Sequence, residues 1–238
     1  MRRPRPSINL KRKRGRPAPI IGYYRYWVVL TYLSAVSAVV GMYFALSGHV
    51  GIAVFCLMVC GLCDMLDGPA ARRKERNERE KSYGVQIDSL TDLVSFGVFP
   101  VVIGYSLGAI NLNFDEGPVS SGMVISTGIA AIYVLAALIR LAYFNVIEIE
   151  LQGKREIRKY YEGLPVTSVA ILIPLVYSIC LIFDVLLSLV YPAMLFFIAV
   201  AFVARVRIPK IRGRYLVIFL IIGLPIAIFL IWNIGVSK

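Results

Sequence analysis

Apolar residues in this chain are gathered into long segments, and short polar segments separate them. A helix that crosses a bilayer needs about 20 predominantly apolar residues. Lipid offers the backbone no hydrogen-bond partners, so such segments fold as helices that satisfy their own N–H and C=O groups. The pattern therefore predicts an all-α, polytopic membrane helical bundle with about six to seven transmembrane helices. The apolar segments are residues 27–46, 51–66, 87–107, 123–143, 166–183, 186–204 and 215–234, of which the last could instead be shorter or re-entrant around Gly223 and Pro225.

The polar segments alternate in charge. The basic ones are residues 1–25, 69–83, 145–165 and 205–214, and those without Lys or Arg are residues 47–50 and 108–121. Because cytoplasmic loops carry the excess of Lys and Arg, we expect a cytoplasmic N-terminus and an integral protein of the cell membrane. The expected domains are a basic cytoplasmic tail with an interfacial segment, residues 1–26, and one membrane domain, residues 27–238.

Composition supports a membrane partner. Of all residues, 58% are hydrophobic, and the formal net charge is +12. Such a charge is typical of nucleic-acid binding or of attraction to anionic lipid headgroups. The basic residues flank the apolar segments, which favours the lipid bilayer and argues against a nucleic-acid partner. The four cysteines lie in or at the ends of apolar segments and form neither a zinc-ligand pattern nor a disulfide framework.

Two pairs of aspartates stand where apolar segments meet a polar one. Asp64 and Asp67 close the second segment, and Asp88 and Asp92 open the third. A carboxylate in or near a bilayer is costly, so it marks a candidate functional site. At helical spacing the first pair shares a face with Gly68, Ala71 and Arg72, and the second pair shares one with Gly84. Two antiparallel helices with these faces opposed would bring the four carboxylates together.

Four carboxylates in one cluster predict bound cations. At low dielectric they repel one another unless cations neutralise them. Oxygen ligands select magnesium, manganese or calcium, and four carboxylates suit a site for two divalent cations, which typically serves displacement at phosphorus. The Arg72 guanidinium would bind a phosphate. The alternatives are aspartates that only cap helices or pair with nearby arginines, and a divalent-cation transporter. A transporter would need a polar path, and the third and fourth segments offer no further acid beyond Asp92 towards the outer face.

This stretch resembles the motif of the CDP-alcohol phosphotransferase family, D-x2-D-G-x2-A-R followed by G-x3-D-x3-D. The matching residues are Asp64, Asp67, Gly68, Ala71, Arg72, Gly84, Asp88 and Asp92. The resemblance implies that the four aspartates bind two divalent cations and that Asp92 is also the general base. It further implies a CDP site lined by the glycines, the alanine and the arginine, and a homodimer. Two features depart from the family pattern, the longer spacer at residues 73–83 and Pro69, which we expect to disturb the helix.

Three further stretches resemble the phosphatidylserine synthase branch of that family. They are DSLTDLVSFGVFP at 88–100, IRLAYFN at 139–145 and YEGLP at 161–165, and Tyr143 stands where that branch has a second arginine. The branch implies transfer of the phosphatidyl group from CDP-diacylglycerol to L-serine, which gives phosphatidylserine and CMP. Other acceptors (glycerol phosphate, inositol phosphate, choline) and an archaeal-type lipid donor remain alternatives.

Three residues are candidates for the acceptor pocket. Arg140 and Asn145, at the end of the fourth apolar segment, would bind an amino-acid carboxylate, and Ser95, about one turn after Asp92, would line the pocket. The simpler alternatives are that Arg140 only extends to the interface or pairs with an aspartate, and that Ser95 only packs.

Overall fold

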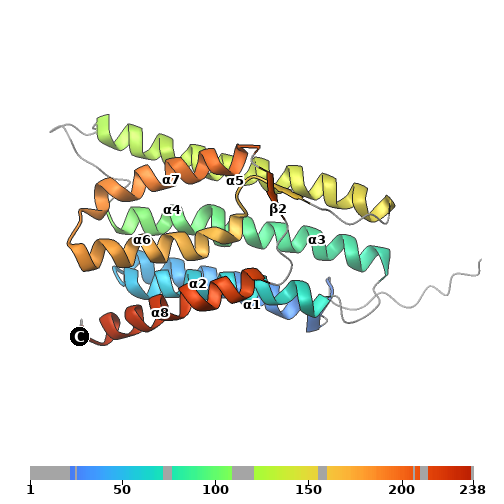
Figure 1. Ribbon diagram of the computed structural model, residues 1–238, viewed down its shortest axis with the longest axis horizontal. Coiled ribbons are helices and arrows are strands. Elements are labelled where there is room, and N and C mark those ends of the chain that lie inside the picture. The colour runs from blue at the N-terminus through green and yellow to red at the C-terminus, as the bar shows by residue number, and fades with distance from the viewer. Residues whose placement is uncertain are drawn as a thin grey trace, which may run out of the picture.

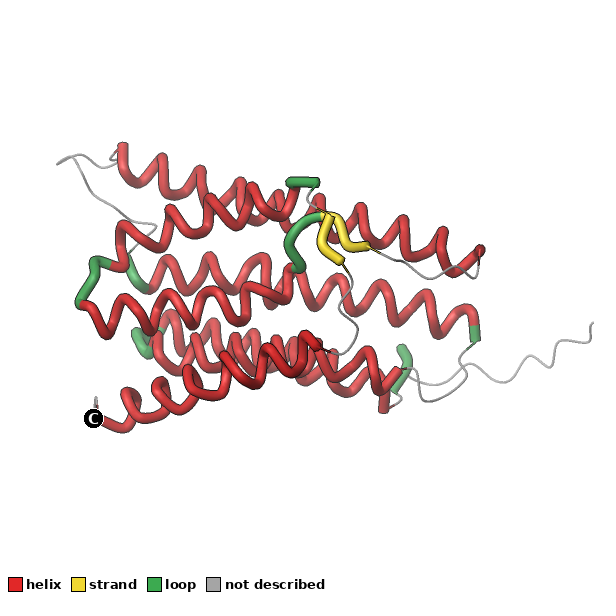
Figure 2. Tube along the Cα trace, viewed as in Figure 1, coloured by secondary structure: helices red, strands yellow, loops and turns green. Residues whose placement is uncertain are grey.

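The structure is a computed structural model that describes residues 22–24, 26–71, 77–108, 121–154, 160–205, 207–209 and 214–236. Helices that lie roughly along one common axis make up nearly all of it (Figures 1 and 2). In chain order the elements are α1 (Tyr26–Leu46), α2 (Val50–Ala71), α3 (Glu78–Asp92), the π-helical η1 (Leu93–Val98), α4 (Phe99–Ser106), α5 (Ser121–Lys154), β1 (Tyr160–Glu162), the 3-10 helix η2 (Val166–Ser168), α6 (Val169–Phe183), α7 (Leu187–Val203), β2 (Arg207–Pro209) and α8 (Arg214–Val236).

The predicted membrane bundle is confirmed. Among the described residues, five helical stretches are long and apolar enough to cross a bilayer, and two apolar helices are shorter. The five are Val28–Leu46, Val50–Asp67, Arg79–Ser106, Gly122–Ile147 and Val166–Phe183, and the shorter two are Leu187–Val203 and Phe219–Gly235. The protein is thus an integral membrane protein. The last apolar segment is one helix, α8, that continues through Pro225.

Two helices extend further into the predicted polar loops than expected. α3 begins at Glu78 rather than near residue 87, and α5 continues to Lys154 through the first half of the predicted loop 145–165. The 34 residues of α5 rise about 51 Å at about 1.5 Å per residue, well beyond the roughly 30 Å hydrocarbon core. Glu, Gln and Lys are good helix formers, so the helices continue in water after the apolar segments end. Figure 1 shows α3 and the yellow end of α5 extending to the right of β2.

A small β-sheet lies beside the helices, in two segments that we predicted as polar loops. β1 and β2 pair antiparallel, with Tyr161 opposite Ile208. Each strand has three residues and comes from a segment predicted as a polar loop. The pair joins the chain before α6 to the chain after α7 (Figure 2). Pro69, which we expected to disturb the helix, lies inside α2, two residues before its end, so the helix continues past it.

Small residues allow the central helices to approach closely. α1 packs along α2, and α2 also packs against α6 and α8. A Cβ atom at Gly41 of α1 would overlap the ring of Phe99 in α4, and one at Gly61 of α2 would overlap the methyl group of Ala170 in α6. Small residues at such contacts are typical of helix packing in membranes, where backbones associate by close approach. Gly61 is one turn before Asp64, so this contact also fixes α6 beside the aspartates.

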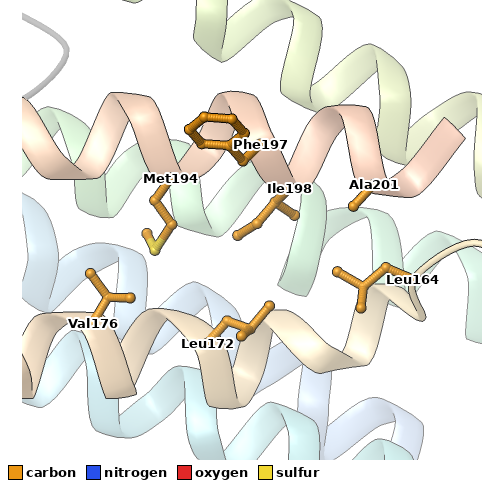
Figure 3. Close-up of a pocket in the computed structure, with 7 residues that line it drawn as sticks. All are labelled: Leu164, Leu172, Val176, Met194, Phe197, Ile198 and Ala201. Carbon is orange, nitrogen blue, oxygen red and sulfur yellow. The ribbon is translucent and has the colours of Figure 1, made fainter. Parts of the chain in front are cut away.

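An apolar groove lies between α6 and α7. These two helices pack against different neighbours: α6 contacts α2 and α8, whereas α7 contacts α5. It has a volume of about 350 Å³. Figure 3 shows side chains of α7 facing those of α6 across it. Its lining residues are Leu164, Leu172, Val176, Met194, Phe197, Ile198 and Ala201.

Gly61→Ala is expected to destabilise the protein, because the new methyl group must push α6 away from α2. Overpacking of this kind costs about 1–3 kcal/mol. The matched control is Gly128→Ala in α5, where a Cβ meets nothing within 4 Å and the change stabilises a helix by about 0.5–1 kcal/mol. Thermal unfolding of the purified protein in detergent measures both variants. Equal unfolding temperatures for the two would contradict the close approach of α2 and α6.

Candidate functional site

The structure brings three of the four motif aspartates together. One carboxylate oxygen from each of Asp64, Asp88 and Asp92 lies within 4.8 Å of the other two. Asp64 comes from α2, and the other two come from successive turns of α3, about 6 Å apart along the helix axis. All three side chains are half-buried. The two faces expected to oppose each other therefore do so at these residues.

Asp67 lies at the edge of this group. It is one turn after Asp64 on α2, and its carboxyl group lies beside that of Asp88. The hydroxyl of Thr31 in α1 donates a hydrogen bond to Asp67 Oδ2 at 3.4 Å. On the other side, the side chain of Thr167 in η2 hydrogen-bonds the carboxyl of Asp64. Hydroxyls from α1 and from the start of α6 thus flank the carboxylates.

The donor set fits a divalent cation. Carboxylates are hard oxygen ligands of the kind that magnesium, manganese and calcium prefer. Asp64, Asp88 and Asp92 place three such oxygens close enough to share one ion. Without a cation, three ionised carboxylates at this separation repel one another strongly. A cation would remove this repulsion and hold α2 against α3.

The site lies where the apolar part of the bundle meets its polar extension. Phe96 and Phe99, on the turns that follow Asp92, are fully buried. Before Asp88, Tyr83 contacts the hydroxyl of Tyr32 in α1 through its own hydroxyl at 2.9 Å. The carboxylates therefore stand between a dry core and the polar end of α3.

The family model of the CDP-alcohol phosphatidyltransferases matches residues 28–229. The chain belongs to this family. It is 38% identical over 136 residues to a Saccharomyces cerevisiae protein named CDP-diacylglycerol–serine O-phosphatidyltransferase, covering 53% of this chain and 43% of the relative.

Two further relatives belong to an archaeon and a bacterium. The archaetidylserine synthase of Methanothermobacter thermautotrophicus is 30% identical over 145 residues, which cover 61% of this chain and 54% of the relative. A Helicobacter pylori protein named CDP-diacylglycerol–serine O-phosphatidyltransferase is 26% identical over 166 residues, which cover 70% and 61%. The chain thus spans roughly half the length of these relatives, from 43% to 61%.

The remaining residues of the family motif are placed only in part. Gly84 is half-buried in α3, one turn before Asp88. Gly68 and Ala71 lie in the last residues of α2, and their surroundings are outside what the structure describes, as is Arg72 altogether. The role of these residues in a CDP site stays a prediction.

The three candidates for an acceptor pocket lie in different surroundings. Asn145 accepts a hydrogen bond through Oδ1 from the Oγ of Ser89 at 2.6 Å. Ser89 is the residue that follows Asp88 in the chain. Arg140 is buried, with its guanidinium carbon 4.4 Å from the centre of the Phe144 ring. Ser95 is fully buried in η1, with its hydroxyl 3.4 Å from that of Ser34 in α1. Asn145 is thus beside the aspartate helix, and Ser95 is in a contact between helices.

Sequence reasoning did not identify Thr31, Thr167 or Ser89. Thr31 and Thr167 carry a hydroxyl in an apolar helix or just before one, where such a group needs a hydrogen-bond partner, whereas Ser89 lies among the polar residues of α3. That signal was present, but several other Ser and Thr residues share it, including Ser37, which donates to the Cys56 carbonyl. Only the arrangement of the helices separates a hydroxyl that contacts an aspartate from one that contacts the backbone.

Proposed function

We propose that the protein transfers the phosphatidyl group of CDP-diacylglycerol to L-serine, producing phosphatidylserine and CMP. The observation that carries the proposal is the group formed by Asp64, Asp88 and Asp92 where the apolar helices end. Membership of the family supports the transferase chemistry. The names of the yeast and bacterial relatives support the donor and the acceptor.

In the proposed reaction, the serine hydroxyl oxygen attacks the phosphorus that carries the lipid. Asp92 takes the hydroxyl proton as the general base. The new P–O bond forms as the bond to the bridging oxygen of the diphosphate breaks, and CMP leaves with that oxygen. Two magnesium or manganese ions held by Asp64, Asp67, Asp88 and Asp92 would neutralise the charge on the diphosphate and on the leaving phosphate.

The nucleotide and the acceptor would bind on opposite sides of the carboxylates. Gly68, Ala71, Arg72 and Gly84 line the CDP side in this proposal, where small residues allow close approach and the arginine binds phosphate. On the α5 side, Asn145 is joined to α3 through Ser89, which supports a place near the acceptor. Arg140 would supply positive charge for the serine carboxylate. Ser95 acts on the acceptor only through the position of η1, because its hydroxyl contacts α1.

The groove between α6 and α7 supports a donor with hydrocarbon chains. Its lining is apolar, and it begins at Leu164. Leu164 is three residues before Thr167, whose side chain hydrogen-bonds the Asp64 carboxyl. A lipid diphosphate held at the carboxylates would therefore have an apolar surface beside it for a chain.

Orientation and assembly complete the proposal. The excess of Lys and Arg in residues 69–83, which connect the two aspartate pairs along the chain, supports an active site that faces the cytoplasm of a cell membrane. The family resemblance alone supports a homodimer. A second candidate keeps the serine acceptor and changes the donor to an archaeal-type lipid, and the 30% identity to an archaetidylserine synthase favours it over changes of acceptor.

An acceptor screen tests the proposed function. The purified full-length protein receives CDP-diacylglycerol with Mg²⁺ or Mn²⁺ and, separately, L-serine, glycerol phosphate, inositol phosphate or choline, and CMP release is measured. We expect release with L-serine above the rate without acceptor, loss of release with EDTA, and recovery when Mn²⁺ is restored. A parallel assay replaces the donor with its ether-linked archaeal counterpart.

The possible outcomes separate the alternatives. CMP release with another alcohol but not with serine would contradict the acceptor only. A preference for the ether-linked donor would favour the second candidate. No release with any acceptor and either donor would contradict the transferase, and cation flux into vesicles would then test the transporter alternative.

A further inference from the structure

The chain changes its helical form directly after Asp92. Residues of η1 form a π-helix, in which the N–H of Phe99 donates to the Val94 carbonyl, five residues earlier instead of four. π-Helical turns inside α-helices are rare and occur frequently at functional sites. Here the turn separates the aspartate-bearing α3 from the buried α4. Its conformation therefore sets the path of the backbone that leaves Asp92.

A buried tyrosine supplies a donor to this segment. Pro100 has no N–H, so the helix cannot provide a donor from that position to the carbonyl of Phe96, four residues earlier. The hydroxyl of Tyr133 in α5 donates to the Phe96 carbonyl at 2.6 Å. Tyr133 is fully buried. Polar groups in an apolar interior need hydrogen-bond partners, so the hydroxyl supplies this carbonyl with a donor in place of the missing N–H of Pro100 and ties η1 to α5.

A second tyrosine makes the same kind of contact further from the aspartates. The hydroxyl of Tyr191 in α7 donates to the Pro100 carbonyl at 2.7 Å, and Tyr191 is also almost fully buried. Phe96 is one turn after Asp92, whereas Pro100 is two turns after it and lies in α4. The two bonds match in chemistry and burial but differ in their distance from the site.

We propose that Tyr133 is a positioning residue for the carboxylate site. Its hydroxyl holds η1 at Phe96 and thereby keeps the Asp92 carboxyl within reach of Asp64 and Asp88. This inference rests on the proposed function, in which those carboxylates share a cation. It adds a residue outside the family motif and on a different helix, with no contact to the carboxylates themselves.

The test compares Tyr133→Phe with Tyr191→Phe in the full-length protein. Each change removes one buried hydroxyl and keeps the ring. Mn²⁺ binding is followed by the electron paramagnetic resonance signal of free Mn²⁺, and thermal unfolding is measured in parallel. We expect both variants to lose similar stability, whereas Tyr133→Phe weakens Mn²⁺ binding by about tenfold and Tyr191→Phe by about twofold or less.

Pro100→Ala provides a second variant. An alanine at this position would restore a backbone N–H that can donate to the Phe96 carbonyl, so in this background Tyr133→Phe should weaken Mn²⁺ binding by about threefold or less. An undiminished loss would show that the hydroxyl does not replace the missing N–H, and would overturn the proposal.

Equal effects of Tyr133→Phe and Tyr191→Phe on Mn²⁺ binding would also overturn it, since both tyrosines would then act only on stability. Measurements on the unmodified protein distinguish failure of this inference from failure of the proposed function. An unmodified protein that binds Mn²⁺ but releases no CMP would contradict the transferase and leave the comparison of the two tyrosines intact. An unmodified protein that binds no Mn²⁺ would overturn both.

Discussion

Replacing Asp92 by asparagine is expected to lower kcat for CMP release by about 10²–10⁴-fold, the usual contribution of a general base. Asparagine keeps the size of the side chain and one oxygen ligand, but it cannot accept the serine proton. Asp92 sits in the carboxylate group with Asp64 and Asp88. The variant should therefore retain CDP-lipid binding while it loses turnover. Pre-steady-state CMP release and binding of the CDP-lipid measure the two effects separately.

Asp184→Asn is a matched control for this variant. Asp184 lies in the turn between α6 and α7 and has φ 52°, a conformation that asparagine adopts readily. The same change of charge far from the site should leave turnover unchanged. If Asp92→Asn loses CDP-lipid binding and turnover to the same extent, Asp92 is chiefly a metal ligand, and another group must accept the proton.

The carboxylate group could be predicted because its members follow local rules. Asp88 and Asp92 are four residues apart, so any helix places them on one face. Asp64 is at the end of the second apolar segment, and the chain must reverse its direction across the membrane before the third segment begins. Opposed faces then follow from an antiparallel connection, and the structure agrees for Asp64, Asp88 and Asp92.

The rest of the site depends on contacts between distant segments. Thr167 reaches Asp64 because Gly61 and Ala170 let α6 approach α2 closely, and no local pattern encodes that distance. The same holds for the bond from Tyr133 to the Phe96 carbonyl, which joins residues 37 positions apart. Pro100 gave a local sign that the helix lacked a donor, but the sequence did not show which hydroxyl would replace it.

Polarity was a poor guide to where helices end. The segments 69–83 and 145–165 were predicted as loops because they are charged, yet α3 and α5 continue into them. Charge marks the boundary of the bilayer, whereas a helix ends where its backbone loses partners. At the start of α3, the backbone N–H of Asn77 donates to Glu80 at 3.2 Å. Both helices that extend in this way contribute to the proposed acceptor side of the site, where Ser89 of α3 contacts Asn145 of α5.

Asp64→Asn and Asp67→Asn are expected to differ in their effect on cation binding. Asp64 belongs to the group of three carboxylates, whereas Asp67 lies beside that group, next to Asp88, and receives a hydrogen bond from Thr31. Removing the Asp64 charge leaves the other two carboxylates to repel each other without a shared ion. We expect Mn²⁺ affinity to fall by about a hundredfold or more, comparable to the loss of one partner from a buried charge pair. Turnover should fall with it.

Asp67→Asn should instead remove one of the two proposed ion sites and leave the other. Native protein should bind two Mn²⁺, and Asp67→Asn should bind one with nearly native affinity, because Asp64, Asp88 and Asp92 remain. Equilibrium titration with Mn²⁺ gives the stoichiometry, and Thr31→Val is the matched control, since it removes the hydrogen bond to Asp67 but keeps the charge. A native stoichiometry of one would contradict the two-ion proposal while leaving the three-carboxylate group in place. Equal losses of affinity in Asp64→Asn and Asp67→Asn would show that all four aspartates act as a single ligand set, with Asp67 drawn into the group when the ions bind.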